Sequence, residues 1–461
     1  MRDTLSRRAF VSGAALGIAG LFLPHSRLLS LTGNVLLTDQ DLSKIDSVIT
    51  SFLCSYFGNL SAIGISNPAD FHFNENDNTR MVVTMSDWNR QAFLSLGFSY
   101  ENIETKVEYQ NFFQISGNRV VVDVDFYMTF RYSDADPIKQ KSKMRTEYCF
   151  ELSRSRSSDW LIDSVQTSFD TFMRFQNMVE VVKNEGRQSK GGLNSNIIEE
   201  AKDRLLREDD AWFRSVASEP ALTSAESALA RGEANTYRLS QLPSRGLVYY
   251  NWVMAYYYAE WFATAPSSAW IFKDLSNSGG DCTNFTSQCI WAGFGGIVPA
   301  FDHLGYYIGP DTSAMKTLIN TRKYMNDNGN LDTGWFGHGN GASNPWGNVD
   351  YFWNTASATV QPNGNPFMSS VLASLVGYGL ILWIWEGDIL QFRYSSTQGS
   401  SFNHSTFVDY SDYTGTLSGI YVSEHSPQFF SRKLTDKLLA SGGASNVHLR
   451  NMKMENSDLT L

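Results

Sequence analysis

A cysteine at position 282 stands in a setting that activates thiols. Gly279 and Gly280 precede Asp281 and Cys282, and a helix-like segment follows, which Gly293 would end. Asp281 can cap such a helix, so Cys282 falls in the first turn, where the positive end of the helix dipole favours the thiolate. The sequence therefore predicts a nucleophilic thiol at position 282. The alternative is a small buried cysteine without chemistry, as free cysteines usually are.

A histidine and a further polar residue downstream could complete a nucleophilic site. His404 opens an alternating apolar segment typical of a strand, and a second such segment leads to Glu424 and His425. If Val408 faces Ile420 in an antiparallel hairpin, His404 lies opposite Glu424, or opposite His425 after a slip by one residue. A thiol, a base and a group that orients the base are the parts of thiol nucleophilic catalysis. A hydrogen-bonded structural histidine is the alternative.

These blocks resemble the putative amidase domain family, which is similar in fold to the NlpC/P60 and CHAP groups of papain-like cysteine peptidases and amidases. The resemblance covers residues 246–434 and rests on the Cys282 block, the Gly387-Asp388 turn before a strand, His404-Ser405 opening the next strand, and Ser423-Glu424-His425-Ser426 on the strand after. It implies a papain-like domain that hydrolyses amide bonds, as many relatives do in bacterial cell walls. It also implies roles for individual residues: Cys282 as nucleophile, His404 as general base and acid, and His425 as the residue that orients the imidazole, with Glu424 or Asp409 as alternatives for the third role.

Further side chains are candidates for stabilising the reaction. The backbone N–H of Cys282 is a natural oxyanion donor, and Tyr258 is a candidate side-chain donor. Asn284 and Gln288 lie one helical turn apart and could contact substrate, although core packing for Tyr258 and hydrogen bonding to a loop for the two amides are the alternatives. The remaining histidines have no partners at metal-ligand spacing, so we expect neither a metal nor another cofactor.

The elements that must position these residues predict an α+β chain. Thr38 resembles a helix cap, and apolar residues recur after it at helical spacing. Alternating segments then follow at 122–132, 144–152 and 160–165. A helix followed by an antiparallel sheet predicts an α+β domain over 38–180, in an order similar to the cone-shaped domain of the nuclear transport factor 2-like superfamily.

The remaining segments predict how the chain is organised. Residues 184–245 begin polar and Gly-rich and then turn charged and amphipathic, which predicts a linker with helices that bridge the two domains. The papain-like domain would follow at 246–434. Residues 435–461 are polar, which predicts a frayed tail.

The first residues resemble an export signal of the twin-arginine type, which carries folded proteins across a prokaryotic membrane. Arg7 and Arg8 precede an apolar run over 10–23. As a helix this run would rise about 21 Å, short of the roughly 30 Å hydrocarbon core, so no stable membrane span is expected. We therefore expect residues 1–30 to direct the protein to the periplasm, the cell wall or the extracellular space.

The charge of the chain narrows the possible partners. The chain has 37 Lys and Arg residues and 47 Asp and Glu residues, which gives a formal net charge of −10. We therefore do not expect nucleic-acid binding that is mainly electrostatic. The sequence predicts an exported thiol-dependent amidase or peptidase, with cell-wall peptide or another amide as substrate. The alternative is an inactive papain-like domain that binds cell-wall material or a protein.

Overall fold

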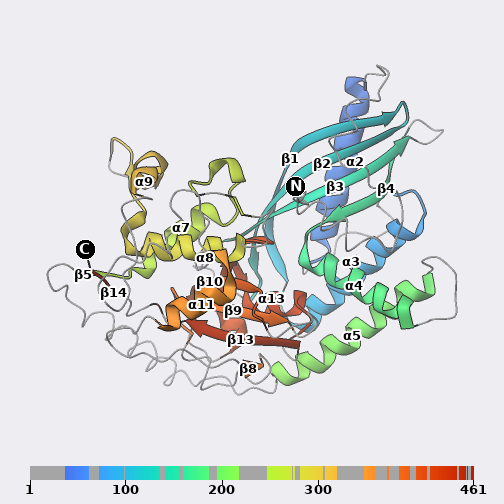
Figure 1. Ribbon diagram of the computed structural model, residues 1–461. Helices are drawn as coiled ribbons and strands as arrows, with labels where there is room; N and C mark the ends of the chain where they lie inside the picture. Colours follow the sequence, from blue (N-terminus) through green and yellow to red (C-terminus); the bar gives the residue numbers. More distant parts are fainter. Residues whose placement is uncertain are drawn as a thin grey trace, which may run out of the picture. The chain divides into compact units, whose positions relative to one another are not determined.

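The computed structural model divides into two compact units, residues 1–213 (unit 1) and 214–461 (unit 2) (Figure 1). The structure describes residues 37–61, 72–97, 99–134, 141–154, 159–185, 195–217, 247–272, 274–275, 281–304, 307–318, 347–358, 371–372, 384–394, 401–412, 416–443, 446–452, 454 and 458–460. The expected export signal at 1–30 lies outside these residues. Of the helices that the structure describes, none has the length and apolar character needed to cross a membrane.

Unit 1 consists of an antiparallel sheet with helices packed against it, so the predicted α+β class is confirmed. Its strands follow each other in the order β1-β2-β3-β4. The elements are α2 (Asp39–Gly58), α3 (Asp77–Ser95), β1 (Tyr100–Ser116), β2 (Arg119–Tyr132), β3 (Ser142–Arg154), β4 (Trp160–Thr167), α4 (Asp170–Glu185) and α5 (Ser195–Ala217).

The first helix of unit 1 begins where the sequence predicts. The Thr38 hydroxyl accepts a hydrogen bond from the backbone N–H of Asp41 over 3.1 Å, and the Asp41 side chain accepts from the backbone N–H of Thr38, which satisfies two otherwise unpaired donors. Further along α2, Phe57 stacks on Phe126 of β2 with 4.8 Å between ring centroids. The apolar stripe of α2 therefore forms the core between helix and sheet.

Helix α5 differs from the predicted bridge between domains. Its buried Asp209 accepts a hydrogen bond from the indole of Trp88 in α3 over 2.9 Å and pairs with Arg174 of α4 over 2.8 Å. Ile198 and Leu205 of α5 are fully buried as well. Residues 195–213 thus pack as part of unit 1, because α5 has an apolar face opposite its charged face, and α3 and α4 cover the apolar face.

The described residues of unit 2 include antiparallel strands that lie side by side in the order β12-β11-β10-β9-β13-β8. These strands are β8 (Val371–Leu372), β9 (Ile389–Tyr394), β10 (His404–Ser411), β11 (Ile420–Glu424), β12 (Gln428–Lys433) and β13 (Val447–Met452). Two small pairs join β5 (Leu247–Tyr249) to β14 (Asp458–Thr460) and β6 (Pro299–Phe301) to β7 (Tyr307–Pro310). The helices are α7 (Trp252–Phe262), α8 (Asp281–Trp291), α9 (Thr312–Leu318), α11 (Val349–Ala358) and α13 (Leu434–Ala440), with shorter turns at Ser267–Ala269, Ala292–Gly296 and Leu417–Gly419.

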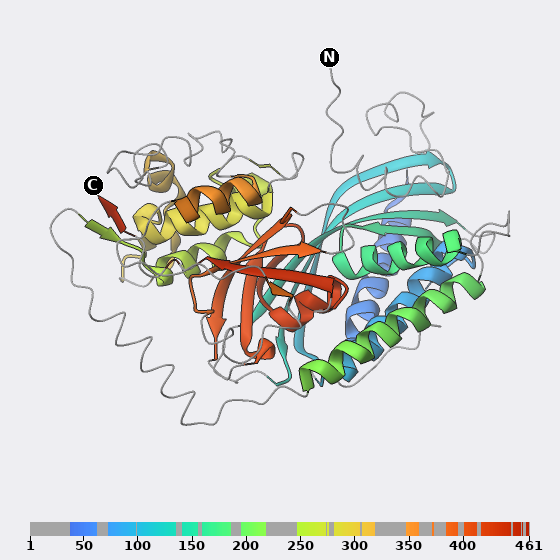
Figure 2. The same cartoon turned by 60° about the horizontal axis from the view of Figure 1, so that its bottom comes forward.

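Helices α7 and α8 lie side by side and pack on β10, as both views show (Figures 1 and 2). The core between them and the sheet contains Phe285 and Cys289 of α8, Phe407 of β10 and Phe430 of β12, all fully buried. Helix α8 is buried along its whole length. The helix that carries Cys282 is therefore held rigidly against the strand that carries His404.

The last segment of the chain corrects the prediction of a polar tail over 435–461. Leu438 and Leu439 of α13 are fully buried, and Val447 and Leu449 of β13 are buried where β13 pairs with β9. The apolar positions of these two elements are separated by polar residues, so neither element shows a long apolar run. The domain therefore continues past residue 434.

Candidate active site

Helix α8 begins at the candidate nucleophile. Asp281 and Cys282 are its first two residues, and the Asn284 side chain donates a hydrogen bond to the Asp281 carboxylate over 3.1 Å. Cys282 is only 5% exposed, and its Sγ lies 4.0 Å from the carbonyl oxygen of Asn403. The first backbone N–H groups of a helix have no partner within it and carry the positive end of its dipole. Position 282 is thus electrostatically suited to a thiolate.

The register of the β10–β11 hairpin explains which polar residue meets the histidine. Val408 pairs with Val422, two residues away from the predicted partner Ile420. Beside His404, a shift by two residues leaves the side chains on the face that the sequence predicted, so His404 and Glu424 still share a face. A register shift between Val408 and Tyr410 affects only the part of the hairpin farther from His404. Glu424 lies diagonal to His404 rather than opposite, within reach of a long side chain.

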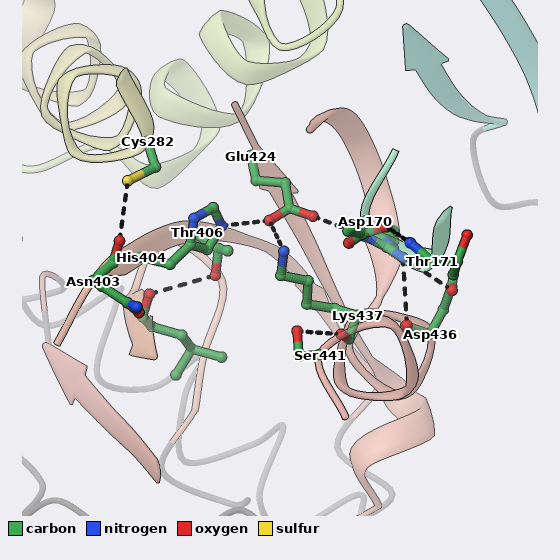
Figure 3. Close-up of polar contacts among 12 residues, drawn as sticks. Asp170, Thr171, Cys282, Asn403, His404, Thr406, Glu424, Asp436, Lys437 and Ser441 are labelled. Carbon is green, nitrogen blue, oxygen red and sulfur yellow. Dashed lines mark hydrogen bonds and ion pairs between the residues drawn. The ribbon is translucent and has the colours of Figure 1, made fainter. Parts of the chain in front are cut away.

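His404 lies between the thiol and this carboxylate (Figure 3). Its Nε2 is 2.5 Å from Oε2 of Glu424, and the ring is close enough to the Cys282 thiol for each group to shift the pKa of the other. Because Nε2 is engaged by the carboxylate, Nδ1 is the ring nitrogen that faces Cys282. Cys282 of α8, His404 of β10 and Glu424 of β11 therefore lie in this order, with His404 in the middle (Figure 3).

The charges in this line favour a thiolate–imidazolium pair. Burial by itself would raise the pKa of Cys282, but the charge of His404 and the hydrogen bond with it bring that pKa below its ordinary value. Burial and the nearby ammonium of Lys437 would lower the pKa of His404, but Cys282 and the hydrogen bond to Glu424 raise it above its ordinary value. The two shifts widen the pH range over which a thiolate and an imidazolium coexist.

Glu424 is a fully buried carboxylate held by three cationic groups. Besides His404, it pairs with Lys437 through Oε2 over 2.8 Å and with Arg432 through Oε1 over 3.1 Å. Burial would raise the pKa of Glu424, but Lys437, His404 and Arg432 hold it well below its ordinary value. A buried charge requires such partners. Glu424 is therefore an ionised hydrogen-bond acceptor.

His425, which the resemblance implied as the orienting residue, lies elsewhere. Its Nδ1 is 2.9 Å from the Asp281 carboxylate, and its Nε2 is 3.1 Å from the carbonyl oxygen of Phe262. Its ring stacks between two aromatic rings, those of Trp270 and Phe285. As the residue after Glu424, it points to the opposite side of the strand, where it anchors the start of α8. The structure brings Glu424, and not His425, to His404.

The expected oxyanion and substrate candidates are engaged inside the protein. The Tyr258 hydroxyl donates a hydrogen bond to Oε1 of Gln288 over 2.6 Å, and both side chains are buried. Asn284 is fully buried and binds Asp281. These contacts fasten α7 to α8 and cap α8. Among the candidates from the sequence, this leaves the backbone N–H of Cys282 as a candidate oxyanion donor.

Asp409, the other alternative for the third role, differs from Glu424 in its ionisation. It is buried in β10, and burial raises its pKa well above the ordinary value. Its electrostatic neighbours include Tyr256 and Cys289. This shift disfavours the ionised form of Asp409, so Asp409 is less suited than Glu424 to support an imidazolium.

A second polar chain holds α8 on the sheet beside the site. The Thr283 hydroxyl lies 3.1 Å from that of Ser405, which accepts a hydrogen bond from Gln391 over 3.1 Å. Arg450 in turn donates to Gln391 over 2.7 Å. These contacts join α8, β10, β9 and β13 directly behind Cys282 and His404. They limit how far the thiol and the imidazole can move apart.

Three charged residues near the site are absent from the sequence prediction: Arg432, Asp436 and Lys437. Arg432 lies on β12, two residues before the expected end of the domain at 434, and Asp436 and Lys437 lie on α13, beyond that end. The apolar pair Leu438-Leu439 was a signal in the sequence that this charged segment is buried, because a frayed tail does not need two adjacent leucines. Metal chemistry has no candidate here: among the described residues, no group of three or more His, Cys, Asp or Glu side chains could hold a metal ion.

Comparison with known proteins adds one finding to this geometry. Residues 249–449 match the putative amidase domain. The match supports hydrolysis of an amide bond, and its range includes Cys282, His404 and Glu424 together with α13 and the first part of β13. This match supports the resemblance to this family that the Cys282 and His404 blocks indicated. No curated protein matches the chain, and no solved structure matches it.

Proposed function

We propose that the chain is a thiol-dependent amidase or peptidase in which Cys282 is the nucleophile, His404 the general base and acid, and Glu424 the residue that orients His404. The observation that carries the proposal is the buried line from Cys282 through His404 to Glu424, with Nε2 of His404 2.5 Å from the carboxylate. The putative amidase domain match over the same residues supports the reaction class.

The reaction follows from this arrangement. His404 accepts the Cys282 proton on Nδ1, and the thiolate attacks the amide carbonyl carbon. The backbone N–H of Cys282 stabilises the resulting oxyanion. The imidazolium then protonates the amine, the C–N bond breaks, and a thioester remains on Cys282. Finally His404 takes a proton from water, the hydroxide attacks the thioester, and the carboxylic acid leaves as the thiol is restored.

We also propose a papain-like arrangement and a site of action outside the cytoplasm. A cysteine at a helix start, a histidine on a strand and a polar residue on the neighbouring strand are the parts of papain-like sites. The basic and apolar pattern of residues 1–30 supports export of the twin-arginine type. Cell-wall peptide is the substrate that fits both features. The helices and antiparallel sheet of unit 1 support a nuclear transport factor 2-like domain in addition to the catalytic domain.

Peptidoglycan digestion tests this proposal. Purified peptidoglycan is incubated with the full chain, and soluble fragments are identified by mass spectrometry. We expect new fragments with a free amine and a free carboxylate from wild type, and none from Cys282→Ala. Cys289→Ala is the matched control, because Cys289 is buried in the same helix and burial raises its pKa well above the ordinary value.

Each outcome of this experiment has a defined meaning. Fragments from wild type and Cys289→Ala alone would support Cys282 as the nucleophile and identify the bond. Fragments from Cys282→Ala as well would exclude the thiol mechanism. Retention of the wild-type protein on peptidoglycan without fragments would favour the alternative of an inactive binding module.

A further inference from the structure

We propose that Lys437 is a positioning residue of this site, which keeps Glu424 an acceptor-only carboxylate and thereby determines which nitrogen of His404 carries the proton. This inference rests on the proposed function of Cys282 and His404. It adds to the site an element, α13, that the sequence placed outside the domain.

The contact geometry singles out Lys437 among the cations. Oε2 of Glu424 is shared by His404 Nε2 at 2.5 Å and Lys437 Nζ at 2.8 Å (Figure 3). Arg432 uses the other oxygen and is divided between Glu424 and Asp436, to which its Nη2 lies 3.2 Å away. Lys437 is therefore the cation placed directly beside the His404–Glu424 bond.

Burial makes this cation necessary. The Glu424 side chain is 0% exposed and that of Lys437 3%, so water contributes little to the solvation of either charge. A carboxylate in such a place becomes protonated unless fixed positive charges oppose it. The ammonium of Lys437 acts with Arg432 to keep Glu424 ionised.

The state of Glu424 decides the tautomer of His404. An ionised carboxylate can only accept, so the imidazole proton resides on Nε2 and Nδ1 offers a lone pair to the thiol. A protonated Glu424 would instead donate to Nε2, and the neutral ring would then carry its proton on Nδ1. In that tautomer His404 cannot accept the Cys282 proton. Lys437 thus acts on the nucleophile through two intervening side chains.

The position of Lys437 is built into a short helix. Helix α13 begins directly after β12, and the Ser441 hydroxyl donates to the Lys437 carbonyl oxygen over 2.8 Å at its end. The apolar residues Leu438 and Leu439 fix the helix in the core. The ammonium is therefore held beside Glu424 by packing and not by its own flexible stem alone.

The test is the pH dependence of Cys282 alkylation, which requires no substrate. Iodoacetamide modification of the Cys282 peptide is followed by mass spectrometry in the full chain. The charged or titratable groups around the His404–Glu424 pair are Cys282 on α8, Asp409 on β10, Arg432 on β12, and Asp436 and Lys437 on α13. Removing one cation from this set raises the pKa of every neighbouring group. The acid limb of the profile is the pH range over which the alkylation rate of Cys282 rises with pH. For Lys437→Met we expect this acid limb to move up by about one pH unit, so alkylation within it slows about tenfold.

Two further variants separate charge from packing. Lys437→Arg keeps the positive charge, so its limb should stay near the wild-type position. Lys433→Met removes a neighbouring buried lysine whose ammonium lies 5.7 Å from the Tyr421 ring centroid, and it should leave the limb in place. Thermal unfolding of each variant verifies the fold.

The outcomes distinguish this inference from the proposed function. A normal, fast-reacting Cys282 whose acid limb is the same in wild type and Lys437→Met would overturn the role of Lys437 alone. An equal shift in Lys433→Met or Lys437→Arg would overturn it too, because the effect would then not depend on the charge beside Glu424. A slow-reacting Cys282 in wild type would overturn both proposals.

Discussion

His404→Ala should abolish amide hydrolysis and leave Cys282 a slow thiol. Without the imidazole, the thiol loses the charge that opposes burial, so its pKa rises above the ordinary value. A catalytic unit that loses its base falls in kcat by roughly 10⁶-fold. A higher thiol pKa leaves less thiolate at pH 6, so we expect alkylation at pH 6 to slow by about 100-fold. Peptidoglycan fragment release and the alkylation rate of the Cys282 peptide measure the two effects.

His448→Ala provides the matched control for this change. His448 lies on β13 of the same sheet and is partly exposed, so its loss should alter neither measurement. If His404→Ala retained the wild-type alkylation rate at pH 6, His404 would not be the group that activates the thiol.

Glu424→Gln should reduce hydrolysis by roughly 10³- to 10⁴-fold, the scale seen when a triad carboxylate becomes an amide and the wrong histidine tautomer results. The amide nitrogen of glutamine can donate to Nε2 of His404, which places the ring proton on Nδ1. The change also leaves Lys437 and Arg432 facing a neutral group. An uncompensated buried charge lowers the free energy of unfolding by about 3–5 kcal/mol.

His425→Gln is the comparison that tests the assignment of the third role. It weakens the anchoring of Asp281, and we expect a loss of about 1–3 kcal/mol in the free energy of unfolding with fragment release largely retained. Chemical denaturation and fragment release are measured on both variants. A greater loss of hydrolysis in His425→Gln than in Glu424→Gln would assign the orienting role to His425.

Local signals predicted much of the fold. The cap at Thr38 and the apolar spacing after it predicted α2, because a capping box and a helical stripe are short-range features. Alternation predicted β2 and β3 for the same reason. The packing of α5 on unit 1 and the burial of β13 could not be predicted this way, because both depend on which distant residues cover a short apolar face.

In the candidate site, too, short-range features could be predicted from the sequence and contacts between distant residues could not. Spacing alone placed Cys282 at a helix start and His404 at a strand start, where the structure has them. The error of two residues in the hairpin register was harmless because it preserved the face of Glu424, whereas a slip of one residue would have exchanged Glu424 for His425. Lys437 could not be predicted from the sequence, because its role depends on a contact with the buried carboxylate of Glu424 in another element.

The pH dependence of Cys282 alkylation in the wild-type chain tests the central claim most directly. Iodoacetamide labelling of the Cys282 peptide is compared with that of the exposed Cys54 in the same sample. An activated thiol should already react at its half-maximal rate well below about pH 8.5, the ordinary thiol pKa, and His404→Ala should remove this reactivity. A Cys282 profile that rises only near or above that pH, unchanged by His404→Ala, would contradict the account.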